Sequence, residues 1–114
     1  MFGLERVLIR RGYKHIRTNV CSMYVKQVRA FIIMMYKTQR GTTFNYRIIK
    51  HSNGEFYSVS EYDVRHKCRL LYPWVETESE IIALERFIIN GDADRSTIAR
   101  KGDIIDKRLL GNLF

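Results

Sequence analysis

The sequence predicts an α+β fold with a short N-terminal helix, a three-stranded antiparallel β-meander and two to three C-terminal helices. Two observations lead to this prediction. Between residues 31 and 60, runs of β-branched and aromatic residues alternate with turn residues, as is typical of neighbouring strands. On either side of that region, apolar residues recur at helical spacing. The chain has 114 residues, of which 46% are hydrophobic, so we expect one domain, 1–114, with its own core.

The N-terminal helix is expected over residues 2–11. Gly12 follows the apolar residues at helical spacing and suits the C-terminal cap. Arg10 and Arg11 fall in the last turn, where cations interact favourably with the helix dipole. These two arginines either stay solvated at the helix end or contact phosphates. Residues 13–28 fit both a helical and an extended pattern, and we expect an extended segment that runs into a strand.

The meander is predicted by its two turns. The run "FIIMMYK" ends at "TQRGT", in which Gly41 suits a left-handed turn position. The runs "TTFNYRIIK" and "FYSVS" flank Asn53 and Gly54, a pair that tolerates the positive φ angles of a type I′ hairpin turn. With these two residues as the loop, Lys50 lies opposite Tyr57. The sequence therefore predicts three strands and fixes the register of the second hairpin.

Register also assigns side chains to the two faces of the meander, because they alternate along a strand. A three-residue loop at 39–41 would put Tyr36 opposite Phe44. One face then carries Ile32, Met34, Tyr36, Phe44, Tyr46, Ile48, Tyr57 and Val59. The other carries Phe31, Ile33, Met35, Thr43, Asn45, Arg47, Ile49, Phe56, Ser58 and Ser60. We expect the first set to form the core and the second to be covered at its apolar edge and open around Asn45 and Arg47.

Two helices are indicated directly after the meander. The stretch "SEYDVRHKCRLLY" starts with the helix cap Ser60 and has a cationic face away from an apolar stripe that includes Leu71 and Tyr72. The stretch "ETESEIIALERFIING" combines a capping box of Thr77 and Glu80 with acids in the first turns and a glycine after the last apolar residue. These signals predict one amphipathic helix with a basic surface and a second that packs on the core.

A last helix is expected over residues 92–110. The single proline, Pro73, marks the expected boundary between a basic α/β part, 1–72, and a helical C-terminal part, 75–110.

Basic residues are concentrated in the first half of the chain. Lys and Arg number 20 against 12 acids, which gives a net charge of +8. Residues 1–50 hold eleven basic residues and one acid, a charge of +10, whereas residues 51–114 hold nine and eleven, a charge of −2. Such a basic block attracts polyanions, of which nucleic acid is the commonest in a cytoplasm. The same charge is also compatible with a basic protein that binds an acidic protein partner.

No segment of the sequence predicts export or membrane insertion. The longest uncharged apolar run, 30–36, is too short to span a bilayer, and the first residues carry charges where a signal peptide would be apolar. We therefore expect a cytoplasmic protein with no membrane partner and with reduced, buried thiols at Cys21 and Cys68. A zinc site would have to combine these cysteines with His66 and one of His15 or His51, and no spacing motif specifies it.

The sequence contains no recognised catalytic motif, neither a nucleophile elbow nor a zinc-protease helix nor a phosphate-binding loop. A Mg²⁺-dependent nuclease would need clustered carboxylates near a lysine, and Glu55, Glu61, Asp63 and Lys67 are a group of that kind. Ordinary roles in turns and helix starts explain these carboxylates more simply. We therefore expect a protein that is not an enzyme and has no cofactor or metal ion, with the nuclease as a weaker alternative.

Basic and aromatic residues interleave in "RRGYKHIR", "YVKQVR", "YKTQRGTTFNYR" and "VRHKCR". Cationic side chains neutralise phosphates, and exposed aromatic rings stack on unpaired bases. The sequence therefore predicts a small DNA- or RNA-binding protein. Its expected contact residues are Arg10, Arg11, Lys14, Arg17, Arg40, Asn45, Arg47, Lys50, Arg65, Lys67 and Arg69. Among them, Asn45 and Arg47 are the candidates for base contacts, since both side chains can make bidentate bonds to base edges.

The rival hypothesis is a protein-binding module. The predicted C-terminal helices are amphipathic and nearly neutral, so exposed apolar surface on them would dock a protein partner or a second copy of the chain. A small domain without catalytic motifs also suits a regulator or inhibitor encoded by a phage or mobile element.

Overall fold

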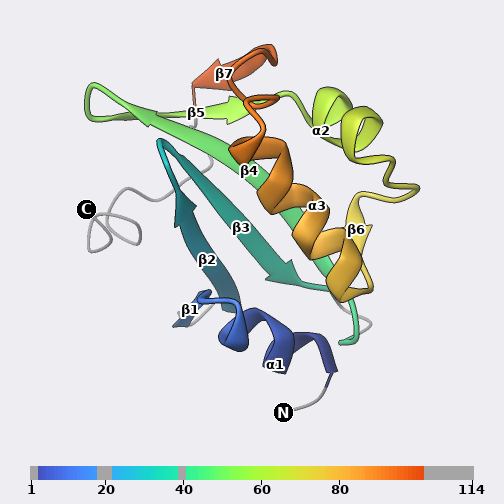
Figure 1. The fold of residues 1–114 in the computed structure, drawn as a ribbon. Coiled ribbons are helices and arrows are strands. Elements are labelled where there is room, and N and C mark those ends of the chain that lie inside the picture. Colours follow the sequence, from blue (N-terminus) through green and yellow to red (C-terminus); the bar gives the residue numbers. More distant parts are fainter. Residues whose placement is uncertain (1–2, 18–21, 39–40, 102–114) are drawn as a thin grey trace.

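The structure, a computed structural model, describes residues 3–17, 22–38 and 41–101. Its core is an antiparallel sheet in which β1 to β5 are neighbours in sequence order (Figure 1). The strand β7 extends the sheet beyond β5, and the short β6 pairs with one end of β4. The elements are α1 (Gly3–Arg10), β1 (Lys14–Arg17), β2 (Ser22–Val28), β3 (Phe31–Lys37), β4 (Phe44–Ser52), β5 (Glu55–Val59), α2 (Glu61–Cys68), β6 (Trp74–Val75), α3 (Glu78–Ile89) and β7 (Ile98–Lys101).

The predicted fold, a three-stranded meander followed by helices, is wrong. Residues 13–28 supply two further strands, β1 and β2, on one side of the meander. The predicted helix at 92–110 is replaced by turns up to Ser96 and by β7, and its remainder from 102 onward lies outside the described residues. Pairing with β5 explains the change, because the gain from extending a sheet outweighs a weak local helix preference.

The β4–β5 hairpin forms in the predicted register. Asn53 and Gly54 have φ angles of 53° and 76°, as a type I′ turn requires, and Lys50 lies opposite Tyr57. The β3–β4 pair does not form in the predicted register, because Phe44 lies opposite Lys37 and not opposite Tyr36. A one-residue slip moves every side chain of a strand to the opposite face. The predicted face assignment of β3 is therefore inverted.

The sheet has two apolar faces. On the face that we call the first, Phe31, Ile33 and Met35 of β3 pack with Tyr46 and Ile48 of β4 and with the buried residues of all three helices. Figure 1 shows α1 and α3 lying over this face. The second face carries a separate cluster, in which each side chain is at most 4% exposed. That cluster consists of Met23, Val25, Ile32, Met34, Ile49 and Phe56.

The helix α3 forms where the sequence predicts it. The Thr77 hydroxyl accepts a hydrogen bond from the backbone N–H of Glu80, and the Glu80 carboxylate accepts one from the backbone N–H of Thr77. This capping box satisfies donors that the first turn leaves unpaired. The side chains of Ile81, Leu84 and Ile88 are fully buried against the first face. Within the described residues no helix is both long and apolar enough to cross a membrane.

Candidate nucleic-acid interface

The predicted contact residues do not gather on a single surface. Arg10 forms an ion pair of 2.9 Å with Glu78, and Arg11 forms one of 2.7 Å with Glu85. Both acids belong to α3, so these two arginines are paired within the molecule. Since a neutralised cation attracts phosphate weakly, α1 is a poor candidate for the interface.

The cations of the strands are also dispersed. Lys14 and Arg17 lie on the edge strand β1, where Lys14 is opposite Val25 and Arg17 is opposite Ser22. Because the side chains alternate, these two point to opposite faces of the sheet. By the same argument, Asn45 and Arg47 belong to the second face and Lys50 to the first, while Arg40 lies outside the described residues.

Three predicted cations, Arg65, Lys67 and Arg69, remain together on α2 and its C-terminal cap. The helix begins at Ser60, whose hydroxyl accepts a hydrogen bond from the backbone N–H of Asp63 at 3.3 Å. It ends after Cys68, because Arg69 adopts a left-handed conformation with φ 57°. Lys67 is 3.9 Å from Asp92, and the guanidinium of Arg69 has no acidic partner in the described residues.

The early end of α2 corrects a further prediction. A helix running to residue 72 would bury Leu71 and Tyr72, but they are 79% and 48% exposed. Arg69 gives the physical reason, since its left-handed backbone ends the helix before residue 70. The loop after α2 therefore presents apolar and aromatic side chains to solvent.

Two pairs of parallel rings occur along α2 and this loop. The rings of Tyr62 and His66 lie 5.8 Å apart with an angle of 6° between their planes, and Tyr62 is 73% exposed. The rings of Tyr72 and Trp74 lie 4.7 Å apart at an angle of 2°. The first pair is one helical turn apart on α2, so its rings project from one side of the helix. The second pair is two residues apart, on either side of Pro73. Exposed aromatic faces of this kind can stack on planar ligands.

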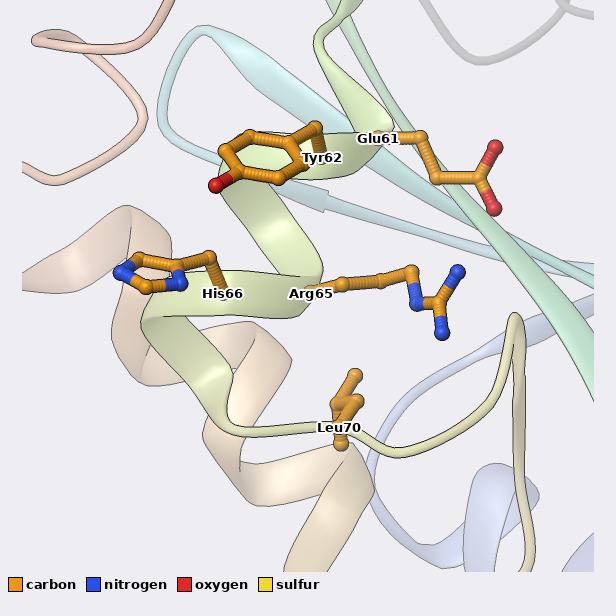
Figure 2. A pocket seen from close by; sticks show the side chains of 5 residues that line it. All are labelled: Glu61, Tyr62, Arg65, His66 and Leu70. Atoms are coloured by element: carbon orange, nitrogen blue, oxygen red, sulfur yellow. The ribbon is translucent and has the colours of Figure 1, made fainter.

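Arg65 connects the two ring pairs. Its guanidinium donates a 2.9 Å hydrogen bond to the carbonyl oxygen of Leu71, in the loop that leads to Tyr72. In Figure 2, the rings of Tyr62 and His66 project from one side of α2, and Arg65 projects from another. An open pocket of about 510 Å³ is lined by Glu61, Tyr62, Arg65, His66 and Leu70 (Figure 2).

We call the set Tyr62, Arg65, His66, Arg69, Tyr72 and Trp74 the α2 surface. Asn45 lies opposite Trp74 where β4 pairs with β6, on the second face of the sheet, and is not included in this set. Sequence reasoning found the two arginines of the set but missed the four ring residues. A signal was available, because Tyr62 and His66 are four residues apart on the predicted cationic helix face, a spacing that brings side chains together.

The groups considered for metal binding are not assembled. In the described part of the chain, no cluster of three or more His, Cys, Asp or Glu side chains is suited to hold a metal ion. Asp63, from the nuclease hypothesis, instead accepts a 2.9 Å hydrogen bond from the backbone N–H of Thr97. Cys68 is half-buried, and this burial raises the pKa of its thiol to about 12, so the thiolate that would bind zinc is disfavoured. Cys21 lies outside the described residues.

No family model, curated protein or solved structure matches this chain.

Proposed function

We propose that the protein binds nucleic acid without catalysis and that the α2 surface is the contact. The observation that carries this proposal is the pairing of exposed rings with cations along α2 and the following loop. Unpaired bases would stack on Tyr62 and Tyr72, and phosphates would bind Arg65 and Arg69. Because base stacking requires unstacked bases, the preferred ligand is single-stranded DNA or RNA.

The proposal predicts a steep dependence of affinity on salt. We expect binding of a fluorescent single-stranded oligonucleotide, measured by anisotropy, to weaken with a log–log slope of about −0.7 for each phosphate neutralised. A duplex of the same sequence should bind more weakly, since its bases are not available for stacking. If neither DNA nor RNA binds at low salt, the proposal is wrong.

Substitutions at Tyr62 test the stacking contact. We expect Tyr62→Ala to weaken single-strand binding by about 5- to 150-fold, the loss of one stacked base worth about 1–3 kcal/mol. Tyr62→Phe keeps the ring and should retain wild-type affinity. Equal losses in both variants would contradict stacking and would indicate a role for the hydroxyl group instead.

Substitutions at two arginines, Arg65 and Arg29, distinguish a contact at the α2 surface from an effect of net charge. Arg29 resembles Arg65, because it donates a 2.9 Å hydrogen bond to a backbone carbonyl, that of Ile89, and lies in the β2–β3 turn. Each change to alanine removes one positive charge, and we expect only Arg65→Ala to weaken binding strongly. Similar losses in the two variants would mean that net charge, and not the α2 surface, attracts the nucleic acid.

A protein partner is the second candidate, and the exposure of Leu71 favours it. Aromatic residues and arginine are enriched at the buried centre of protein interfaces, and Leu71, 79% exposed between the two ring pairs, would add apolar area to such a contact. Such a contact depends on apolar burial and is therefore insensitive to salt, unlike a phosphate contact. If Leu71→Ala abolishes binding of a protein, and added salt leaves that binding unchanged, a protein partner is favoured.

A further inference from the structure

A groove of about 320 Å³ lies between the C-terminal end of α2 and one side of α3. Figure 1 shows the two helices next to each other. From α2 and its cap, Lys67, Cys68 and Arg69 line the groove, and Asp92 lines it from the turns after α3. The lining residues of α3 and its cap recur at intervals of three or four, a spacing that places them on one side of the helix. They are Ser79, Ile82, Ala83, Arg86, Phe87 and Asn90.

The charge of this groove is positive. Lys67, Arg69 and Arg86 are exposed, and Asp92 is the single acid among the described residues that line the groove. Asp92 is already paired with Arg95 at 2.9 Å, and it lies 3.9 Å from Lys67. The guanidinium groups of Arg69 and Arg86 have no acidic partner in the described part of the chain. Since these two charges are not matched, the groove attracts anions.

The acids of α3 lie on another side of the helix from Arg86. Glu78 and Glu85 pair with Arg10 and Arg11 of the N-terminal region, whereas Arg86 lines the groove toward α2. Successive residues of a helix point in different directions, because 3.6 residues make one turn. The carboxylates of α3 therefore do not neutralise Arg86.

The floor of the groove is uncharged. The Cys68 thiol donates a 3.6 Å hydrogen bond to the carbonyl oxygen of Ala83, and burial raises its pKa, which keeps it protonated at neutral pH. Ile82 and Ala83 are half-buried, and Phe87 is buried. The exposed cations thus surround an apolar floor, an arrangement that suits a ligand with anionic groups on a less polar frame.

A further pocket connects this groove with the α2 surface. Its volume is about 340 Å³, and it shares His66 with the pocket of Figure 2 and Lys67 and Asp92 with the groove. Arg69 belongs both to the α2 surface and to the groove lining. The three depressions therefore form one path around α2, from the exposed rings to Arg86.

We propose that a nucleic-acid strand bound on the α2 surface continues into the groove between α2 and α3, where Lys67 and Arg86 bind the phosphates of its neighbouring nucleotides. Because it concerns the same ligand, this proposal rests on the proposed function. It adds Lys67 and Arg86 to the phosphate contacts of Arg65 and Arg69, and it makes the binding site longer than the two ring pairs alone require.

Salt titrations of matched arginine variants test the groove. With a single-stranded oligonucleotide of about 16 nucleotides, long enough to cover several contacts, the full chain is compared with two variants. Arg86→Ala should reduce the log–log salt slope by about 0.7 and lower the affinity at about 0.1 M salt about fivefold, the loss of one phosphate contact. Arg17→Ala removes an equal charge from an exposed position on β1, at the opposite edge of the sheet from β5 and α2. Its slope should equal that of the wild type.

Two further measurements separate a phosphate contact from a structural role of Arg86. Arg86→Lys keeps the charge and should restore the wild-type slope. In the wild type, the side-chain Nε–Hε resonance of Arg86 should shift when the oligonucleotide is added, and that of Arg17 should not. The groove proposal is overturned if Arg86→Ala leaves the salt slope unchanged. If Arg65→Ala still weakens binding in that case, the α2 surface stands without the groove, whereas a chain that binds neither DNA nor RNA at low salt overturns both proposals.

Discussion

Replacing Glu85 by alanine is expected to lower the free energy of unfolding by about 3 kcal/mol, because the change breaks a buried charged network. Glu85 is 4% exposed in α3. Its carboxylate accepts hydrogen bonds from Arg11 at 2.7 Å and from the Tyr13 hydroxyl at 3.0 Å, and Lys26 lies 3.5 Å away. Alanine would leave the buried Tyr13 hydroxyl without its acceptor and Arg11 without its countercharge.

Urea unfolding followed by circular dichroism measures this loss. The matched control is Glu78→Ala, which removes another α3 carboxylate that pairs with an arginine of the N-terminal region, Arg10. The Glu78 side chain is 40% exposed, so its loss should cost at most about 1 kcal/mol. Similar costs for the two variants would contradict a special role for the buried network.

The same network makes stability depend on pH in acid. Burial opposes the charge of Glu85, but hydrogen bonds from Arg11 and Tyr13 and the charge of Lys26 hold its pKa below the ordinary value of 4.5. A carboxyl whose pKa is lower in the folded state stabilises the fold fully above the unfolded pKa and loses that effect as the pH falls through the folded pKa. We therefore expect the stability difference between wild type and Glu85→Gln to shrink below pH 4.5, as chemical unfolding at several pH values would show.

The second large effect concerns two neighbouring residues of β3. Ile33 lies on the first face and Ile32 on the second, and both are 0% exposed. We expect Ile33→Ala and Ile32→Ala each to lower the free energy of unfolding by about 3 kcal/mol, the usual cost of a cavity at a buried isoleucine. Equal costs would follow from equal burial on the two faces.

Ile89→Ala is the control for this comparison, because Ile89 is 48% exposed at the end of α3. Its cost should stay within about 0.5 kcal/mol. Urea unfolding at fixed pH measures all three variants. If Ile32→Ala behaves like Ile89→Ala, the second face of the sheet is open to water in solution, and the burial seen here would be contradicted.

Local chemistry explains which parts of the fold were predictable. The Asn53–Gly54 hairpin and the helix α3 each follow from a few adjacent residues, because turn geometry and the capping box of Thr77 and Glu80 are local interactions. The β3–β4 register was not predictable in the same way, because no two-residue turn signal defines the connection between Lys37 and Phe44. Nor was β7, whose strand state depends on a partner about forty residues earlier in the chain.

The candidate site was predictable only in part. Charge could be counted from the sequence, but the distances that pair Arg10 and Arg11 with acids of α3 could not. The cationic side of α2 was identified from the sequence, since the spacing of its basic residues along one helix is a local pattern. The stacking of Tyr72 on Trp74 depends on the end of α2 and on the bend at residues 71–73, and the prediction of a longer helix concealed it.

The ion pairs between the N-terminal region and α3 also have a consequence for biosynthesis. A ribosome makes Arg10, Arg11 and Lys26 well before Glu78 and Glu85, because the chain is synthesised from its N-terminus. The first fifty residues carry a charge of +10 and none of the α3 acids, so these ion pairs cannot form until α3 has been synthesised.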